Sequence, residues 1–269
     1  MSVIVCRQKK AEHPFYIEGL GIHIHSSQEL CYAVYHHPLL FTDGFVDQNL
    51  VEFVREELGM GFVAARMEQR LKSGDRSEEI LLLFMQECDY YTTAELNRLR
   101  QNLGALRKLP PLEYAKKKAD YLAECGQYGR AITGYREILD AAGDKADEQL
   151  IGRIWNNLGA CYARIFQFQK AVDAFDKAYG KKKDQKILEK MYYLANLSPA
   201  VQLKERYRSM ILEDMSERWD KTFKEAGERA GESRRVKEIE ELFEKDSVKR
   251  LEGAAHLVEE WKEEYRNMA

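Results

Sequence analysis

The sequence has few prolines and no long apolar run, and each absence excludes a class of protein. Five prolines in 269 residues are too few for a disordered chain or a loop-rich all-β fold. No stretch reaches the ~18 apolar residues of a membrane span. The apolar residues 1–6 are too few for the core of a signal peptide, and Arg7, Lys9 and Lys10 follow them at once. We therefore expect a soluble, cytoplasmic protein.

The cysteines are scattered, and no CxxC pair is present. They are Cys6, Cys31, Cys88, Cys125 and Cys161. Neighbouring cysteines are at least 25 residues apart, whereas zinc sites and dithiol centres place two cysteines in one short motif. An odd, dispersed set of this kind is typical of reduced thiols.

No charge of one sign dominates the chain. Lys and Arg number 42 and Asp and Glu number 45, which gives a formal net charge of −3. Such a balance provides no long-range attraction to nucleic acid or to an anionic membrane. Two short basic runs, residues 116–118 and 181–183, lack interleaved aromatic residues, and we assign them to solvated helix surfaces. We therefore expect neither nucleic acid nor a membrane as a partner.

Familiar catalytic and cofactor motifs are missing as well. The sequence has no GxSxG, Walker loop, GxGxxG or HExxH motif. Four histidines fall in one short region without an acidic residue at ligand spacing, namely His23, His25, His36 and His37. We expect no enzymatic activity and no cofactor. A small metal-dependent or enzymatic module in the N-terminal region remains an alternative.

A helical motif occupies the middle of the chain. Spacing of i, i+3, i+4 and i+7 predicts one stripe of a helix for Trp155, Leu158, Gly159 and Tyr162. A second, small-large-small helix face follows at Ala171, Phe175 and Ala178. Because Gly159 has no side chain, we expect the two helices to press closest there.

This stretch resembles the tetratricopeptide repeat (TPR) family. It matches the pattern W-x2-L-G-x2-Y…A-x3-F at six positions and departs from it at the closing proline, where Lys183 stands. The resemblance implies an all-α solenoid of stacked helical hairpins. It also implies a concave groove that binds a peptide or helix of another protein, as in an adaptor or scaffold.

Two weaker copies flank the central repeat. The first runs over residues 112–145, with Ala131 and Tyr135 at the Ala-x3-Phe positions. Its 40-residue offset predicts an extended turn or helix end near residues 146–151. The third copy begins near Lys186, lacks the Ala-x3-Phe pair and is interpreted as a degenerate or capping unit. We expect three regions, residues 1–110, 111–198 and 199–269.

The N-terminal region contains one extended segment and several helices. Alternation over residues 15–25 predicts a short strand or extended arm. Ser26 and Glu29 form a capping box for a helix that ends before Pro38. Helical spacing recurs in four later segments, residues 47–58, 62–72, 77–91 and 93–107.

The C-terminal region is highly charged and carries narrow apolar stripes. One stripe, from Leu203 to Ala230, predicts a single helix of about 30 residues. Another runs from Leu251 to Tyr265. These helices either cap the repeats or form the seam of a homodimer, and the chain would then be a self-associating structural protein.

The TPR resemblance also implies which residues line the groove. In the central copy they are Arg153, Asn156, Asn157, Ala160 and Arg164, in the first copy Glu113, Lys116, Asp120 and Glu124, and in the third Ile187, Lys190 and Leu194. Asn157 stands where the family commonly binds peptide backbone. A clamp for a C-terminal carboxylate is not expected, because Asp120, Ile187 and Met191 replace residues that such clamps use. The mixed charge favours a charged peptide or helix.

Overall fold

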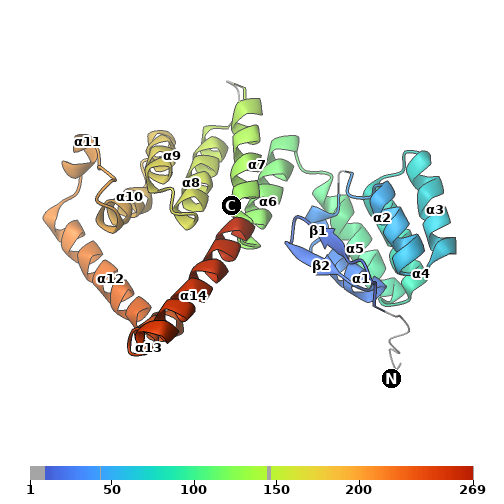
Figure 1. Ribbon diagram of the computed structural model, residues 1–269. Coiled ribbons are helices and arrows are strands. Elements are labelled where there is room, and N and C mark those ends of the chain that lie inside the picture. Colours follow the sequence, from blue (N-terminus) through green and yellow to red (C-terminus); the bar gives the residue numbers. More distant parts are fainter. Residues whose placement is uncertain (1–9, 43, 144–146, 269) are drawn as a thin grey trace. The chain divides into compact units, whose positions relative to one another are not determined.

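The computed structural model describes residues 10–42, 44–143 and 147–268. Helices make up 74% of it, which confirms the predicted all-α fold. The chain forms two compact units, Met1–Cys125 and Gly126–Ala269 (Figure 1). Cysteines 31, 88, 125 and 161 are free thiols, and Cys6 lies outside the described residues. No described helix is long and apolar enough to cross a membrane.

The first unit begins with a hairpin and a capped helix. Strands β1 (Phe15–Ile17) and β2 (Ile22–Ile24) pair antiparallel, so the predicted extended segment is a two-stranded hairpin. Helix α1 (Ser27–His36) follows. The Ser26 hydroxyl accepts from the Glu29 amide at 3.2 Å, and the Glu29 carboxylate accepts from the His25 amide at 2.6 Å. The bond to Ser26 confirms it as the N-cap, but the reciprocal bond of the predicted capping box, from the Ser26 amide, is replaced by one from the amide of His25.

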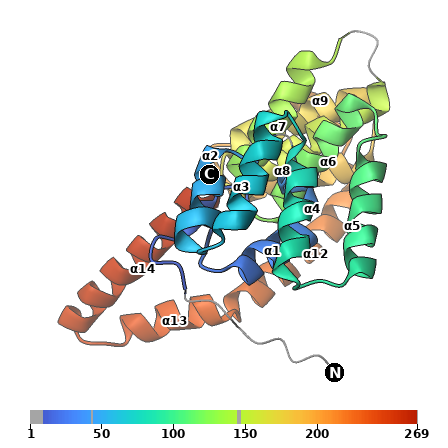
Figure 2. The ribbon, with the colours of Figure 1, turned by 90° about the vertical axis from the view of Figure 1, so that its right-hand side faces the viewer.

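The later helices of the first unit lie close to the predicted segments. They are η1 (Pro38–Leu40), α2 (Gln48–Glu52), the π-helical turn η2 (Phe53–Glu57), α3 (Gly61–Lys72), α4 (Ser77–Cys88), α5 (Thr93–Leu106) and α6 (Pro111–Glu124). Figure 2 shows α2, α3 and α4 from the side. Helix α4 lies at the centre of the core, and its Leu81, Phe84 and Met85 are fully buried.

Helix α6 is bound to the loop that follows α1. The Tyr114 hydroxyl is 2.6 Å from the Thr42 hydroxyl, and the Tyr121 hydroxyl is 2.6 Å from Nδ1 of His37. These contacts place α6 within the first unit. The division between the units therefore follows α6, whereas the sequence placed residues 111–124 with the repeats.

The second unit begins with four consecutive helices. They are α7 (Tyr128–Ala141), α8 (Glu148–Arg164), α9 (Phe168–Lys181) and α10 (Gln185–Leu197). A Cβ atom at Gly159 of α8 would lie 2.8 Å from the Phe175 ring and 3.1 Å from the Ala171 carbonyl oxygen of α9. This confirms Gly159 as the point of close helix approach. Residues 148–151 lengthen α8 at its start, as the repeat offset predicted, while Ala146 lies outside the described residues.

The single long helix predicted from Leu203 to Ala230 is wrong. After α10, residues 198–204 are non-helical. The short helix α11 (Glu205–Arg208) follows, and α12 (Glu213–Gly231) begins after it. Asp176 of α9 explains the break. Its carboxylate accepts hydrogen bonds from the side chains of Lys204 (2.9 Å), Arg206 and Tyr207, which hold this segment against α9. Helices α13 (Arg234–Phe243) and α14 (Ser247–Met268) complete the unit.

The Asp176 cluster predicts an acid-sensitive contribution to stability. Burial raises the pKa of this carboxyl, but the hydrogen bonds from Tyr207, Lys204 and Arg206 outweigh burial and lower it. A lowered folded-state pKa stabilises the protein above the unfolded-state pKa of about 4, and the stabilisation is lost as pH falls through the folded value.

We therefore expect the free energy of unfolding to fall less between pH 6 and pH 3 in Asp176→Asn than in the wild type. Urea unfolding followed by tryptophan fluorescence at several pH values measures this. Parallel pH curves for the two proteins would contradict the assignment.

Candidate functional site

Three of the predicted groove residues meet between α8 and α10. The Lys190 ammonium donates to Oδ1 of Asn156 at 2.9 Å, and Nδ2 of Asn156 donates to Oδ1 of Asn157 at 3.1 Å. All three side chains are half-buried. Asn156 and Lys190 lie 34 residues apart in sequence, and their hydrogen bond links helices α8 and α10. We call these three residues the Asn–Lys cluster.

Lys190 is the charged end of this cluster. Its ammonium lies 5.4 Å from the centre of the Phe175 ring, which covers one side of it. Burial lowers the pKa of Lys190, and the carboxylates of Asp184 and Glu189 offset this only in part. In the described part of the chain, no carboxylate lies within ion-pair distance of Lys190. A half-buried cation without an ion-pair partner favours a ligand oxygen.

The exposed residues of α8 extend the cluster along the helix. Arg153, Ala160 and Arg164 are exposed, and their spacing places them on the same face as Asn156 and Asn157. Neither arginine forms an ion pair with another described residue. This face of α8 therefore carries positive charge around a polar centre.

Two residues predicted to line the groove do not do so. Ile187 and Leu194 of α10 are only 7% and 6% exposed and belong to the hydrophobic core of the second unit. Helix α12 covers α10, with the Phe223 ring stacked on that of Tyr193 at 5.9 Å. The apolar face of α10 is therefore buried in the core, and Lys190 is the residue of α10 that belongs to the Asn–Lys cluster.

The groove residues predicted for the first copy lie on α6, in the first unit. Lys116 and Asp120 form an ion pair of 2.5 Å across one helical turn. Glu113 and Glu124 are exposed on the same helix. The charge of Lys116 is thus neutralised locally by Asp120.

Two of the four histidines in residues 23–37 border an open pocket of about 480 Å³. His23 and His37 line it together with Tyr32 and Tyr90, two aromatic residues that the sequence did not single out. Burial, helped by the neighbouring His36, lowers the pKa of His37 and favours its neutral form. Within the described residues, no three His, Cys, Asp or Glu side chains are placed to hold a metal ion.

Cys31 lies in the same unit as these histidines. A hydrogen bond with Cys88, together with burial, raises the pKa of the Cys31 thiol. The thiol therefore stays protonated at neutral pH, which is the opposite of what a nucleophile requires.

No protein-family model, no curated protein and no solved structure matches this chain.

Proposed function

We propose that this protein is a non-enzymatic adaptor that binds a peptide or helix of a partner protein on the α8–α10 surface. The observation that carries the proposal is the Asn–Lys cluster. It presents a half-buried ammonium, held by Asn156, with no carboxylate to neutralise it among the described residues. The TPR resemblance of the α8–α9 sequence supports the same surface.

The cluster suits a peptide ligand because its groups complement a peptide backbone. A carboxamide side chain contains both a donor and an acceptor, as a peptide group does. Asn156 uses its oxygen to bind Lys190, and this contact fixes the orientation of both side chains. A ligand carbonyl or carboxylate beside Lys190 would recover part of the hydration that burial removes from the ammonium.

The charge of the surface favours an acidic partner. Arg153 and Arg164 flank the cluster along α8 and form no ion pair with described residues. Acidic side chains spaced along a bound segment would meet these cations in turn, which accelerates association and fixes the binding register.

The proposal predicts that binding depends on Asn157 and Lys190. A displayed random-peptide library is selected on the full chain, and the affinity of the enriched peptides is measured by calorimetry. We expect enriched peptides to contain Asp or Glu. We also expect them to bind Asn157→Ala and Lys190→Met about tenfold more weakly than the wild type, because each variant loses a hydrogen bond to the peptide. Lys224→Met, which removes an exposed lysine of α12, is the matched control and leaves affinity unchanged.

Two results would contradict this function. One is a library that yields no sequence that binds the wild type, and the other is a set of enriched peptides that bind all four proteins equally. Circular dichroism spectra that match the wild type establish that each variant is folded.

A further inference from the structure

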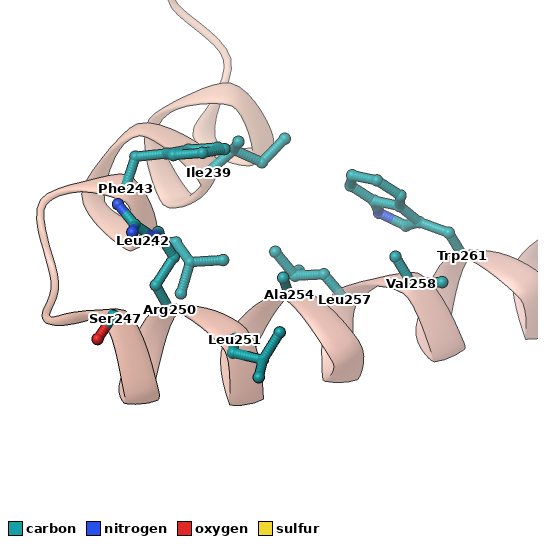
Figure 3. A pocket seen from close by; sticks show the side chains of 10 residues that line it. All are labelled: Ile239, Leu242, Phe243, Ser247, Arg250, Leu251, Ala254, Leu257, Val258 and Trp261. Carbon is teal, nitrogen blue, oxygen red and sulfur yellow. The ribbon is translucent and has the colours of Figure 1, made fainter.

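Helices α13 and α14 form a hairpin with an open apolar groove of about 460 Å³. The two helices meet at the turn between them, diverge from it in Figure 2 and pack through Leu242, which lies against Gly253. Figure 3 shows Ile239 and Phe243 of α13 facing Trp261 of α14 across the opening. None of the described side chains of α14 is buried, although the helix is 22 residues long.

The exposed stripe of α14 has the spacing of a helix–helix seam. Its members alternate strictly between steps of four and three residues over the whole helix, and they are Ser247, Leu251, Ala254, Val258, Trp261, Tyr265 and Met268. These steps make a seven-residue (heptad) repeat that occurs three times along α14. A heptad repeat of this kind places one face of a helix against a second helix. Leu251 is 74% exposed and Trp261 44% exposed, so α13, which lines the groove with them, covers the seam only in part.

The charges of α14 indicate which helix would complete the seam. Its first half is net positive, with Lys249 and Arg250, whereas its second half is net negative, with four glutamates between 259 and 264. A parallel copy of α14 would place like charges side by side. An antiparallel copy would place the positive half of each helix against the negative half of the other.

We propose that the α14 seam binds a second copy of this chain, with the two α14 helices antiparallel. In the register that alternates small and large residues, Ala254 lies opposite Val258 of the second copy, and Leu251 lies opposite Trp261 of the second copy. The residues that flank the seam then bring Arg250 close to Glu264 of the second copy, twice by symmetry.

This register also agrees with the contacts within one chain. Glu264 already accepts a bidentate hydrogen bond from Arg235 of α13, which holds its carboxylate at the edge of the groove. Arg250 lines the same groove and forms no ion pair with a described residue. The second copy would supply the carboxylate that Arg250 lacks. Phe243 and Ile239 of α13 would cover the sides of the seam, giving a bundle of four helices.

Sedimentation equilibrium of the full chain tests the proposal. We expect a dimer, with twice the monomer mass of 31.4 kDa, and expect Leu251→Glu combined with Val258→Glu to raise its dissociation constant at least about a hundredfold. Both side chains are exposed in the monomer, so the variant keeps its fold. Ala226→Glu combined with Ala230→Glu, two exposed alanines of α12, is the matched control and retains the dimer.

The orientation is tested by reversing one charge. Arg250→Glu turns two attractions into repulsions in the antiparallel register, and we expect it to raise the dissociation constant about tenfold at low salt and less at high salt. A wild-type chain that stays monomeric at 100 µM, a concentration at which a weak dimer of about micromolar affinity is populated, would overturn the proposal. So would a dimer that survives the Leu251 and Val258 changes. A dimer insensitive to Arg250→Glu would overturn the register.

Discussion

Replacing Gly159 with leucine is expected to lower the free energy of unfolding of the second unit by about 3 kcal/mol. Even a Cβ atom at this position would lie 2.8 Å from two carbons of the Phe175 ring and 3.1 Å from the Ala171 carbonyl oxygen. The ring is buried and the oxygen belongs to a helix backbone, so neither can move without loss of packing. Helices α8 and α9 would have to separate.

Urea unfolding followed by tryptophan fluorescence measures the stability of the second unit. Trp155, Trp219 and Trp261 all lie in the second unit, so their emission reports on that unit alone. Gly180→Ala is the matched control, because Gly180 is an exposed position of α9 with no atom within 4 Å of an added Cβ. We expect it to stabilise the unit by about 0.5–1 kcal/mol. Equal unfolding midpoints for Gly159→Leu and the wild type would contradict the prediction, because they would show that a leucine side chain fits between α8 and α9.

The elements predicted best were those with local signals at their ends or at their contacts. Ser26 and Glu29 marked the start of α1 because capping involves residues three apart. Gly159 marked the contact between α8 and α9 because a helix pair that packs this closely excludes a side chain. Such features follow from a few neighbouring residues, and a sequence therefore reveals them directly.

In the C-terminal region, the spacing of apolar residues did not predict where the helix is interrupted. Leu203 and Tyr207 are one helical turn apart, and both are buried as the pattern requires. The pattern does not record that Lys204, Arg206 and Tyr207 all bind Asp176, a residue some 30 positions earlier. A stripe of apolar residues fits one long helix and a broken one equally well. The choice between them depends on a distant partner.

The candidate site was predicted in part, for a similar reason. Asn156, Asn157 and Lys190 came from the TPR resemblance, and the structure brings them together. Ile187 and Leu194 came from the same resemblance but are core residues, because α12 packs on α10. The third copy lacks a matching second helix, so the register of a complete repeat does not transfer to it residue by residue.

Tyr207→Ala is expected to lower the free energy of unfolding of the second unit by about 4 kcal/mol. The ring is only 2% exposed and meets the Tyr179 ring edge to face at 5.4 Å. Its hydroxyl donates to the Asp176 carboxylate, and burial together with this carboxylate raises the pKa of Tyr207 to about 12. Alanine would therefore leave a cavity and also remove one of the hydrogen bonds that hold the segment before α12.

Tyr207→Phe separates these two contributions. It keeps the ring and removes the hydroxyl, while Lys204 and Arg206 continue to bind Asp176. We expect a loss of about 1.5–3 kcal/mol, the usual contribution of a hydrogen bond to a charged group, in the same fluorescence-detected urea titration. Equal losses for the two variants would mean that the hydroxyl, not the ring, fixes this segment. Tyr207 belongs to the same hydrophobic cluster as Phe175, whose ring lies against the Lys190 ammonium. Loss of the Tyr207 ring is therefore expected to loosen the packing around Lys190, so peptide affinity falls in Tyr207→Ala and not in Tyr207→Phe.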